Sequence, residues 1–357
     1  MKKSTNLFLY RMCAIAIVVV FTALACFMQP AIAADKQYRF VMISHIGSYD
    51  PNMKWLTLSL EEFEKRYPDV DTEYNYAYQY SLQKNVQYSV QEHVRLIEQA
   101  VATKPDGIAV PIVSSDAMEG PLRNAIERGI PVVAFNIPDT RPEGERIPYL
   151  TYVGGDEYLT GKRLGEFAIQ QANDGKIPKP RKVMCANQNA IHQGLKARYH
   201  GMKDAMKTIG VEVEELFIGA DPAKARNTMK SYLSANKDVN YIFTVASWSS
   251  PWAWSVANEM GLEPDADKKG MTIITVDASP VAFGGIRRGH VLACNSQGFW
   301  LQGFIPMEWL YWYHELGYKP QSDIITGPVI VSADNIDHWE KFVRKIFEKA
   351  YDDLDTW

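Results

Sequence analysis

The sequence predicts an α/β protein of two lobes, each a parallel sheet doubly wound by helices, with a cleft between the lobes. Apolar runs without polar alternation recur along the chain, as in strands that helices cover on both faces. Each run is followed by a segment with helical periodicity. The alternation pauses at 173–180 (Asn-Asp-Gly-Lys-Ile-Pro-Lys-Pro) and then starts again, which indicates a second sheet.

The segment 104–139 shows the repeating unit most clearly. An apolar run at 107–111 is followed by a polar-edged helix at 115–128 and a second apolar run at 131–135. Polar or turn residues, including Asn136, come directly after each run. Because ligands of open α/β sheets bind beyond the carboxyl ends of the strands, these positions are the first candidates for a site.

The remaining elements follow the same alternation. In the first half we expect strands at 38–44, 72–76 and 149–154 and helices at 50–67, 90–103 and 156–171. In the second half we expect strands at 182–186, 211–218, 241–245, 271–277 and 290–295, and helices at 194–209, 222–235, 251–260 and 280–287. A polar connection at 77–89 is longer than a usual β–α loop. An aromatic helix at 299–316, one strand at 324–331 and a helix at 335–351 close the chain.

The first 33 residues have the pattern of a secretory signal peptide: a basic start, an apolar stretch at 12–28 and the cleavage pattern Ala31-Ile32-Ala33. Two alternatives are lipidation at Cys26, before which a leucine stands one place too close, and a retained membrane anchor. Removing this leader from the 357 residues leaves 324, a length that suggests two domains.

The charge and the cysteines limit the function classes. The leader holds three of the 38 basic residues and none of the 42 acidic ones, so the formal charge of the rest is −7. This charge excludes nucleic acid and anionic membranes as expected partners. Of four cysteines, Cys185 and Cys294 remain after the leader. They either pair in an oxidising compartment or stay as two buried thiols.

Catalytic and metal-binding motifs are missing. The chain has no Gly-x-Ser-x-Gly, His-Glu-x-x-His, Walker A or Cys-x-x-Cys pattern, and its seven histidines are scattered. Asp265 and Asp267 lack the further oxygen ligands of a calcium loop. We therefore expect no metal, no cofactor and no enzymatic activity.

Five stretches, taken in order and spacing, resemble the periplasmic sugar-binding proteins of ABC importers, of the ribose- and galactose-binding type (type I periplasmic binding proteins). They are IEQAVATKPDGIAV (97–110), GIPVVAFN (129–136), YVGGDEYLTG (152–161), ARYHGM (197–202) and VDASP (276–280) with NSQG (295–298). Phe-Asn after the fourth strand, Asp-Glu-Tyr and Cys185 are most similar to the branch of simple-sugar importers.

The resemblance implies a hinge that the chain crosses three times. The first lobe would comprise 34–155 plus 298–325, and the second 156–297 plus 326–357. A monomeric periplasmic protein would close on a small sugar or polyol and deliver it to an ABC permease. One alternative is a sensory receptor for a sugar-like signal that acts through a membrane kinase or chemoreceptor.

A second alternative is a secreted glycoside hydrolase, which needs two carboxylates on either side of the scissile bond. Asp277 and Asp50 could face each other in that way. The repressors that share the fold begin with a helix-turn-helix, whereas this chain begins with a leader.

A sugar site needs side chains that donate to and accept from hydroxyls, and an aromatic ring on the sugar face. By resemblance, Asn136, Asp277 and Gln297 are candidates. Asn136 is otherwise a turn former, and Asp277 is otherwise an N-cap for the helix that starts at Pro280. Gln297 is otherwise an ordinary loop residue.

On the helix at 194–209, Arg198 matches the ligand-binding arginines of the family. Lys196 aligns with an arginine of some pentose binders. Both could instead belong to a solvated basic helix face. At the start of the helix at 156–171, Asp156 and Glu157 are expected to complement the helix dipole.

Where the family carries two phenylalanines in the first turn, this chain has four other side chains, which are candidates for ligand binding: His45, Tyr49, Asp50 and Asn52. The stacking ring must therefore come from elsewhere. Trp248 precedes a helix and is the best candidate for it. Trp252 and Trp254, within that helix, are expected in the core.

Overall fold

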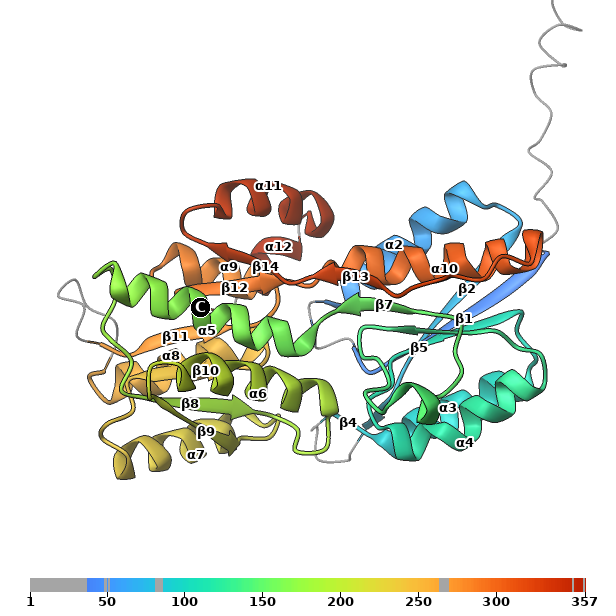
Figure 1. Cartoon of the computed structure of the whole chain (residues 1–357). Helices are drawn as coiled ribbons and strands as arrows, with labels where there is room; N and C mark the ends of the chain where they lie inside the picture. The colour runs from blue at the N-terminus through green and yellow to red at the C-terminus, as the bar shows by residue number, and fades with distance from the viewer. Residues whose placement is uncertain are drawn as a thin grey trace, which may run out of the picture.

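The computed structural model describes residues 37–47, 50, 52–80, 86–262, 270–348, 350–355 and 357. The expected leader with Cys26, the candidate Tyr49 and the pair Asp265 and Asp267 lie outside these residues. Two lobes stand side by side, each a sheet between layers of helices (Figure 1). The predicted fold class is confirmed.

The first lobe contains a six-stranded sheet in the order β13-β7-β6-β5-β1-β2, and all its neighbouring strands are parallel. Its strands are β1 (Tyr38–Ser44), β2 (Val70–Tyr76), β5 (Gly107–Val110), β6 (Val132–Phe135), β7 (Tyr152–Gly155) and β13 (Ile324–Gly327). Every residue of β5, β6 and β7 is buried. This burial explains why these strands read as unbroken apolar runs.

Two helix pairs cover this sheet (Figure 1). One face carries α2 (Met53–Arg66) and α10 (Phe299–Leu316), and the other carries α3 (Val90–Ala102) and α4 (Ser115–Glu127). The two faces bury separate apolar clusters, with Phe40 on the α2 side and Ile43 on the α3 side of β1. Side chains of opposite faces alternate along a strand, so β1 contributes to both layers.

The second lobe contains a parallel four-stranded sheet in the order β11-β10-β8-β9. Its strands are β8 (Lys182–Asn187), β9 (Glu212–Phe217), β10 (Tyr241–Thr244) and β11 (Thr272–Thr275). Its helices are α5 (Glu157–Asn173), α6 (Gln193–Lys207), α7 (Pro222–Ala235), α8 (Ser250–Glu259) and α9 (Pro280–Arg287). The pairs α5–α6 and α7–α8 pack against each other. Two short 3-10 helices are η1 (Glu143–Glu145) and η2 (Ser247–Ser249).

Three segments connect the lobes: β7 to α5, β12 (Ala293–Ser296) to α10, and β13 to β14 (Val329–Ser332) (Figure 1). The expected single strand at 324–331 is wrong. β13 pairs with β7 in the first lobe, while β14 pairs antiparallel with β12. Pro328 separates the two strands, because proline has no N–H to continue a ladder.

Two further segments complete the fold. The expected connection at 77–89 contains an antiparallel pair, β3 (Tyr78–Tyr80) and β4 (Val86–Tyr88), with 81–85 outside the described residues. The helices α11 (Ile336–Phe347) and α12 (Ala350–Leu354) end the chain, and Trp55 of α2 packs against Phe347 of α11 at 5.4 Å between ring centroids.

Cys185 in β8 and Cys294 in β12 are both free and fully buried. The disulfide alternative is therefore not realised. Within the described ranges, no helix is both long and apolar enough to cross a bilayer. The same residues hold no cluster of three or more histidine, cysteine or acidic side chains suited to a metal ion.

Candidate functional site

A cavity of about 370 Å³ lies between the two lobes. This volume falls within the range of roughly 300–1,000 Å³ that is typical of small-molecule sites. The polar and aromatic side chains that line it come from both lobes: His45, Asp50, Asn52, Tyr88, Asn136, Gln188, Asn189, His192, Arg198, Trp248, Asp277 and Phe299. The cavity therefore lies where the carboxyl ends of strands from the two sheets meet, as the rule for open α/β sheets predicts.

The structure brings most of the candidate residues together at this cavity. His45, Asp50, Asn52, Asn136, Arg198, Trp248 and Asp277 line it. Gln297 does not line the cavity, but it donates a hydrogen bond to Asp277, which does. Lys196 is exposed on α6 and is not among the lining residues, and Tyr49 lies outside the described residues.

Asn136 and Asp277 occupy equivalent places on opposite sides of the cavity. Each follows a buried strand, β6 for Asn136 and β11 for Asp277, and each is buried. Both have left-handed backbones, with φ of 58° and 78°. Non-glycine residues adopt this region rarely, and such strain gathers at functional sites.

Asp277 is not the N-cap of α9, because Ser279 caps that helix through a bond from the Ala282 N–H at 3.3 Å. Its carboxylate instead accepts from Asn52 Nδ2 at 3.3 Å and from Gln297 Nε2. Asn52 comes from the first lobe and Asp277 from the second, so this bond crosses the cavity. Asn52 Oδ1 and Gln297 Oε1 are both buried without a protein partner. Asn52 lines the cavity, so its oxygen can accept from a ligand hydroxyl.

Asn136 is fixed by a chain of amides that leads to the hinge. Its Nδ2 donates to Gln302 Oε1 at 2.8 Å, and Gln302 Nε2 donates to the Gln297 carbonyl at 2.8 Å. Tyr152 Oη donates to the Asn136 carbonyl at 2.6 Å. The bond to Gln302 orients the Asn136 amide, and the Tyr152 bond holds its backbone.

Arg198 is anchored inside the second lobe. Its guanidinium makes a two-pronged ion pair with Glu157, in which Nη2 lies 2.9 Å from Oε1, and Nη1 donates to the Val245 carbonyl at 2.6 Å. Both partners of the pair are 5% exposed. The expected dipole role at the start of α5 belongs to Asp156, whose Oδ1 accepts from the Leu159 N–H at 2.8 Å.

The charges of the cavity lining are partly suppressed. Burial, together with the nearby charge of Asp277, raises the pKa of Asp50 to about 7. Burial and the Arg198 charge lower the pKa of His192 to about 3, and burial and His192 lower the pKa of His45 well below its usual range. Burial lowers the pKa of Arg198, but the nearby charges of Glu157, Asp277 and Asp50 have a larger effect and raise this pKa.

The lining therefore presents neutral imidazoles, amides, carboxyl groups and the guanidinium of Arg198, which is already paired with Glu157. Such groups donate to and accept from the hydroxyls of an uncharged polar ligand. Trp248 supplies an indole, which meets Trp252 edge-to-face at 5.0 Å. Trp252 and Trp254 pack on the core of the second lobe and do not line the cavity.

Five polar or aromatic lining residues were not among the candidates from the sequence: Tyr88, Gln188, Asn189, His192 and Phe299. Gln188 and Asn189 come directly after the strand at 182–187, a position that the strand-end rule already favours. Gln188 Oε1 is buried without a partner and Asn189 Oδ1 accepts from the Ile191 N–H at 3.1 Å. His192 carried no such signal, because it is the N-cap of α6, a helix that the sequence predicts to start only at residue 194.

Two hinged lobes around a polar cavity define a protein that closes on a small solute. A family model described as "Periplasmic binding protein domain" matches residues 51–315. The chain belongs to this family and is a solute-binding protein, not an enzyme.

Two solved structures and one curated protein are similar to the chain. An ABC sugar transporter (periplasmic sugar binding protein) from Legionella pneumophila is 27% identical with a TM-score of 0.69, over 82% of this chain and all (100%) of that one. A carbohydrate transporter from Acidothermus cellulolyticus 11B in complex with myo-inositol is 22% identical with a TM-score of 0.73, over 87% of this chain and 99% of that one. The xylose/arabinose-binding protein XylF of Sulfolobus acidocaldarius is 25% identical over 69% of this chain, and the match spans 58% of its length.

Proposed function

We propose that this protein captures a small sugar or polyol between its two lobes and delivers it to an ABC-type permease. The observation that carries the proposal is the polar cavity lined from both lobes, with Asn136 and Asp277 fixed at its opposite walls. The family and the names of the relatives, which bind sugars or myo-inositol, support the same ligand class.

The ligand is uncharged in this proposal. Among the described lining residues the ionisable groups other than histidine and tyrosine are Asp50, Asp277 and Arg198. Arg198 is already paired with Glu157, so no free cation remains to neutralise a phosphate or a carboxylate. A sugar acid or a sugar phosphate would meet an excess of negative charge in a poorly solvated space.

We further propose the oligomeric state, the compartment and the lobe boundaries of the protein. The protein acts as a monomer in the periplasm, after removal of residues 1–33. The lobe boundaries follow the expected scheme, 34–155 plus 298–325 and 156–297 plus 326–357. The pairing of β13 with β7 and of β14 with β12 supports a third crossing close to residue 326.

Isothermal titration tests this proposal with D-xylose, L-arabinose, D-ribose, D-galactose, D-glucose and myo-inositol, and with D-galacturonate and D-glucose 6-phosphate as anions. At least one neutral compound should bind, and the anions should bind far more weakly. Asp277→Asn should weaken the binding at least tenfold, because a charge-assisted bond contributes about 1.5–3 kcal/mol. The matched control is Asp174→Asn, an exposed residue at the far end of α5. Binding of amino acids or nucleosides with no response to any sugar or polyol would overturn the proposal.

A further inference from the structure

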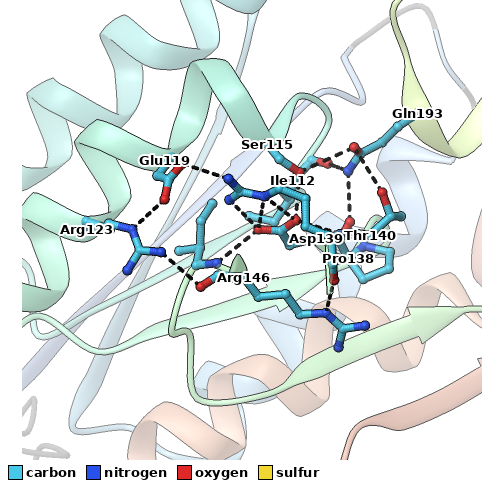
Figure 2. A network of polar contacts seen from close by, with 11 residues as sticks. Ile112, Ser115, Glu119, Arg123, Pro138, Asp139, Thr140, Arg146 and Gln193 are labelled. Atoms are coloured by element: carbon cyan, nitrogen blue, oxygen red, sulfur yellow. Dashed lines mark hydrogen bonds and ion pairs between the residues drawn. The ribbon is translucent and has the colours of Figure 1, made fainter. Parts of the chain in front are cut away.

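The two lobes also touch outside the cavity, at the start of α6. Gln193 is the first residue of this helix, it belongs to the second lobe, and it is not among the residues that line the cavity. Its side chain reaches into the first lobe, where it meets the segments that follow β5 and β6 (Figure 2).

The amide nitrogen of Gln193 makes the principal contacts. Nε2 donates to the carbonyl of Ile112 and to the carbonyl of Pro138, the latter at 2.9 Å. Two carbonyl oxygens can only accept, so they require the NH₂ end of the amide and fix its orientation. The amide oxygen faces the hydroxyls of Ser115 and Thr140 at the longer distances of 3.4 and 3.5 Å.

The receiving side is rigid before the second lobe arrives. Asp139 is fully buried and accepts from Ser115 Oγ at 2.8 Å (Figure 2). It also accepts from the Ile147 N–H at 3.0 Å and from Arg141 Nη2 at 2.7 Å. Arg141 Nη1 also donates to Glu119 of α4 at 2.7 Å. These bonds hold the loop that presents the Pro138 carbonyl, so docking of Gln193 orders little additional chain.

The residues on either side of Gln193 also meet the first lobe. The His192 ring lies 5.1 Å from that of His45 in an edge-to-face arrangement. A Cβ at Gly194 would lie 2.4 Å from Cδ1 of Ile137, so glycine permits this close approach. Three consecutive residues therefore form one contact surface between the lobes beside the cavity.

We propose that Gln193 is a positioning residue that holds the lobes together without touching the ligand. This inference rests on the proposed function, because it assigns to Gln193 part of the affinity for the captured solute. Opening the lobes breaks both N–H···O bonds and exposes the two carbonyls to water. The closed form is therefore populated before a ligand binds, and the apparent dissociation constant varies inversely with that population.

Small-angle X-ray scattering of the ligand-free protein tests the inference without knowledge of the ligand. Gln193→Ala should have a larger radius of gyration than the wild type. Gln193→Glu keeps the size but turns a carboxylate oxygen toward two carbonyl oxygens, so it should open the lobes at least as far. Gln170→Ala, an exposed glutamine on α5 of the same lobe, is the matched control and should scatter like the wild type.

Titration supplies a second readout. With whichever of D-xylose and myo-inositol binds the wild type, Gln193→Ala should bind roughly tenfold more weakly, a change that corresponds to about 1.4 kcal/mol. At saturation its radius of gyration should return to the wild-type value. A purely structural role would instead lower the unfolding temperature and leave the ligand-free radius unchanged.

Two results would overturn the inference: unchanged ligand-free scattering in both Gln193 variants, or a wild-type curve that changes on ligand addition as much as that of Gln193→Ala. If no sugar or polyol alters any curve while the ligand-free variants still differ from the wild type, the proposed function fails and the role of Gln193 stands.

Discussion

Arg198 on α6 and Glu157 on α5 form a two-pronged ion pair in the interior of the second lobe, with Nη2 2.9 Å from Oε1. Burial raises the pKa of Glu157, the adjacent guanidinium works against this effect, and the charges of Asp277 and Asp156 add to it. The two-pronged geometry indicates that the ionised carboxylate is the form present. The pair thus connects the cavity lining to the helix that follows the first hinge segment.

The first prediction is that Glu157→Gln lowers the free energy of unfolding by about 3 kcal/mol. Breaking a buried ion pair leaves an uncompensated charge and typically costs 3–5 kcal/mol. The lower end applies because Asp277 and Asp50 still attract Arg198. Urea unfolding followed by circular dichroism measures the change.

Lys230 and Glu259 provide the control, because they form an ion pair at 3.0 Å in the same lobe with both side chains 48% exposed. Glu259→Gln should leave the unfolding curve unchanged, since exposed pairs contribute little. Equal effects of the two substitutions would contradict the structural importance of the buried pair. Arg198→Ala is a less informative variant, because it leaves the Glu157 carboxylate buried without its partner and therefore changes stability together with binding.

The second prediction concerns Asp50, whose pKa burial and the Asp277 charge raise from 3.8 to about 7. Below pH 4 this carboxyl is protonated in both the folded and the unfolded state. Between pH 4 and 7 the unfolded chain loses the proton first, so the contribution of Asp50 to stability falls as the pH rises and then levels off. Asp50→Asn removes this loss.

Thermal unfolding of the wild type and Asp50→Asn from pH 4 to 8 measures the effect. The variant should gain stability relative to the wild type up to about pH 7 and keep a constant advantage above it. Buried neutral histidines such as His192 act in the opposite sense, losing stability as the pH falls below 6.5. The comparison at each pH cancels this contribution, because the histidines are present in both proteins. A difference that does not vary with pH would show that Asp50 is ionised normally.

The sequence predicted the architecture well because both sheets are parallel and covered on both faces. Their strands are short apolar runs that end in polar residues, so the strand ends could be read directly, Asn136 and Asp277 included. The strand at 324–331 was misread because its two halves are both apolar, and only pairing partners distinguish β13 from β14. Pro328 was the available signal.

The contacts between distant elements were beyond sequence reasoning. Glu157 read as a helix-dipole residue, because nothing local marks it as the partner of Arg198, 41 positions away. Gln193 begins a helix and carries no motif, and its role depends on where the hinge places that helix relative to Ile112 and Pro138. Such contacts arise from the packing of the lobes and leave no periodic signal.

The third prediction is that Cys185 and Cys294 do not react in the folded protein. Both are fully buried, and burial raises the pKa of each thiol well above its usual range. Thiolates, not thiols, are the reactive species. Titration with Ellman's reagent should therefore detect neither of them until guanidinium chloride is added, and a reductant should leave the melting temperature unchanged. A melting temperature that falls with reductant would indicate a disulfide.

The last prediction concerns the crossing of α5 and α6, which places Glu157 beside Arg198. A Cβ at Gly201 would lie 1.9 Å from the Tyr158 carbonyl oxygen, and a Cβ at Gly161 would lie 1.9 Å from that of Arg198. Each contact is with backbone, so no side chain can move aside. The two helices can approach this closely only because both positions are glycine.

Gly201→Ala should therefore lower the free energy of unfolding by at least about 3 kcal/mol, the upper end of the usual cost of overpacking. It should also weaken ligand binding, because separating the helices withdraws Arg198 from Glu157 and from the cavity. Gly144→Ala is the control: its Cβ would meet nothing within 4 Å, and its unfolding free energy should change by less than about 0.5 kcal/mol. Urea unfolding measures the stability of both variants, and titration measures their ligand binding. Wild-type stability in Gly201→Ala would mean that the helices separate without cost, and the close crossing would then not be what positions Arg198.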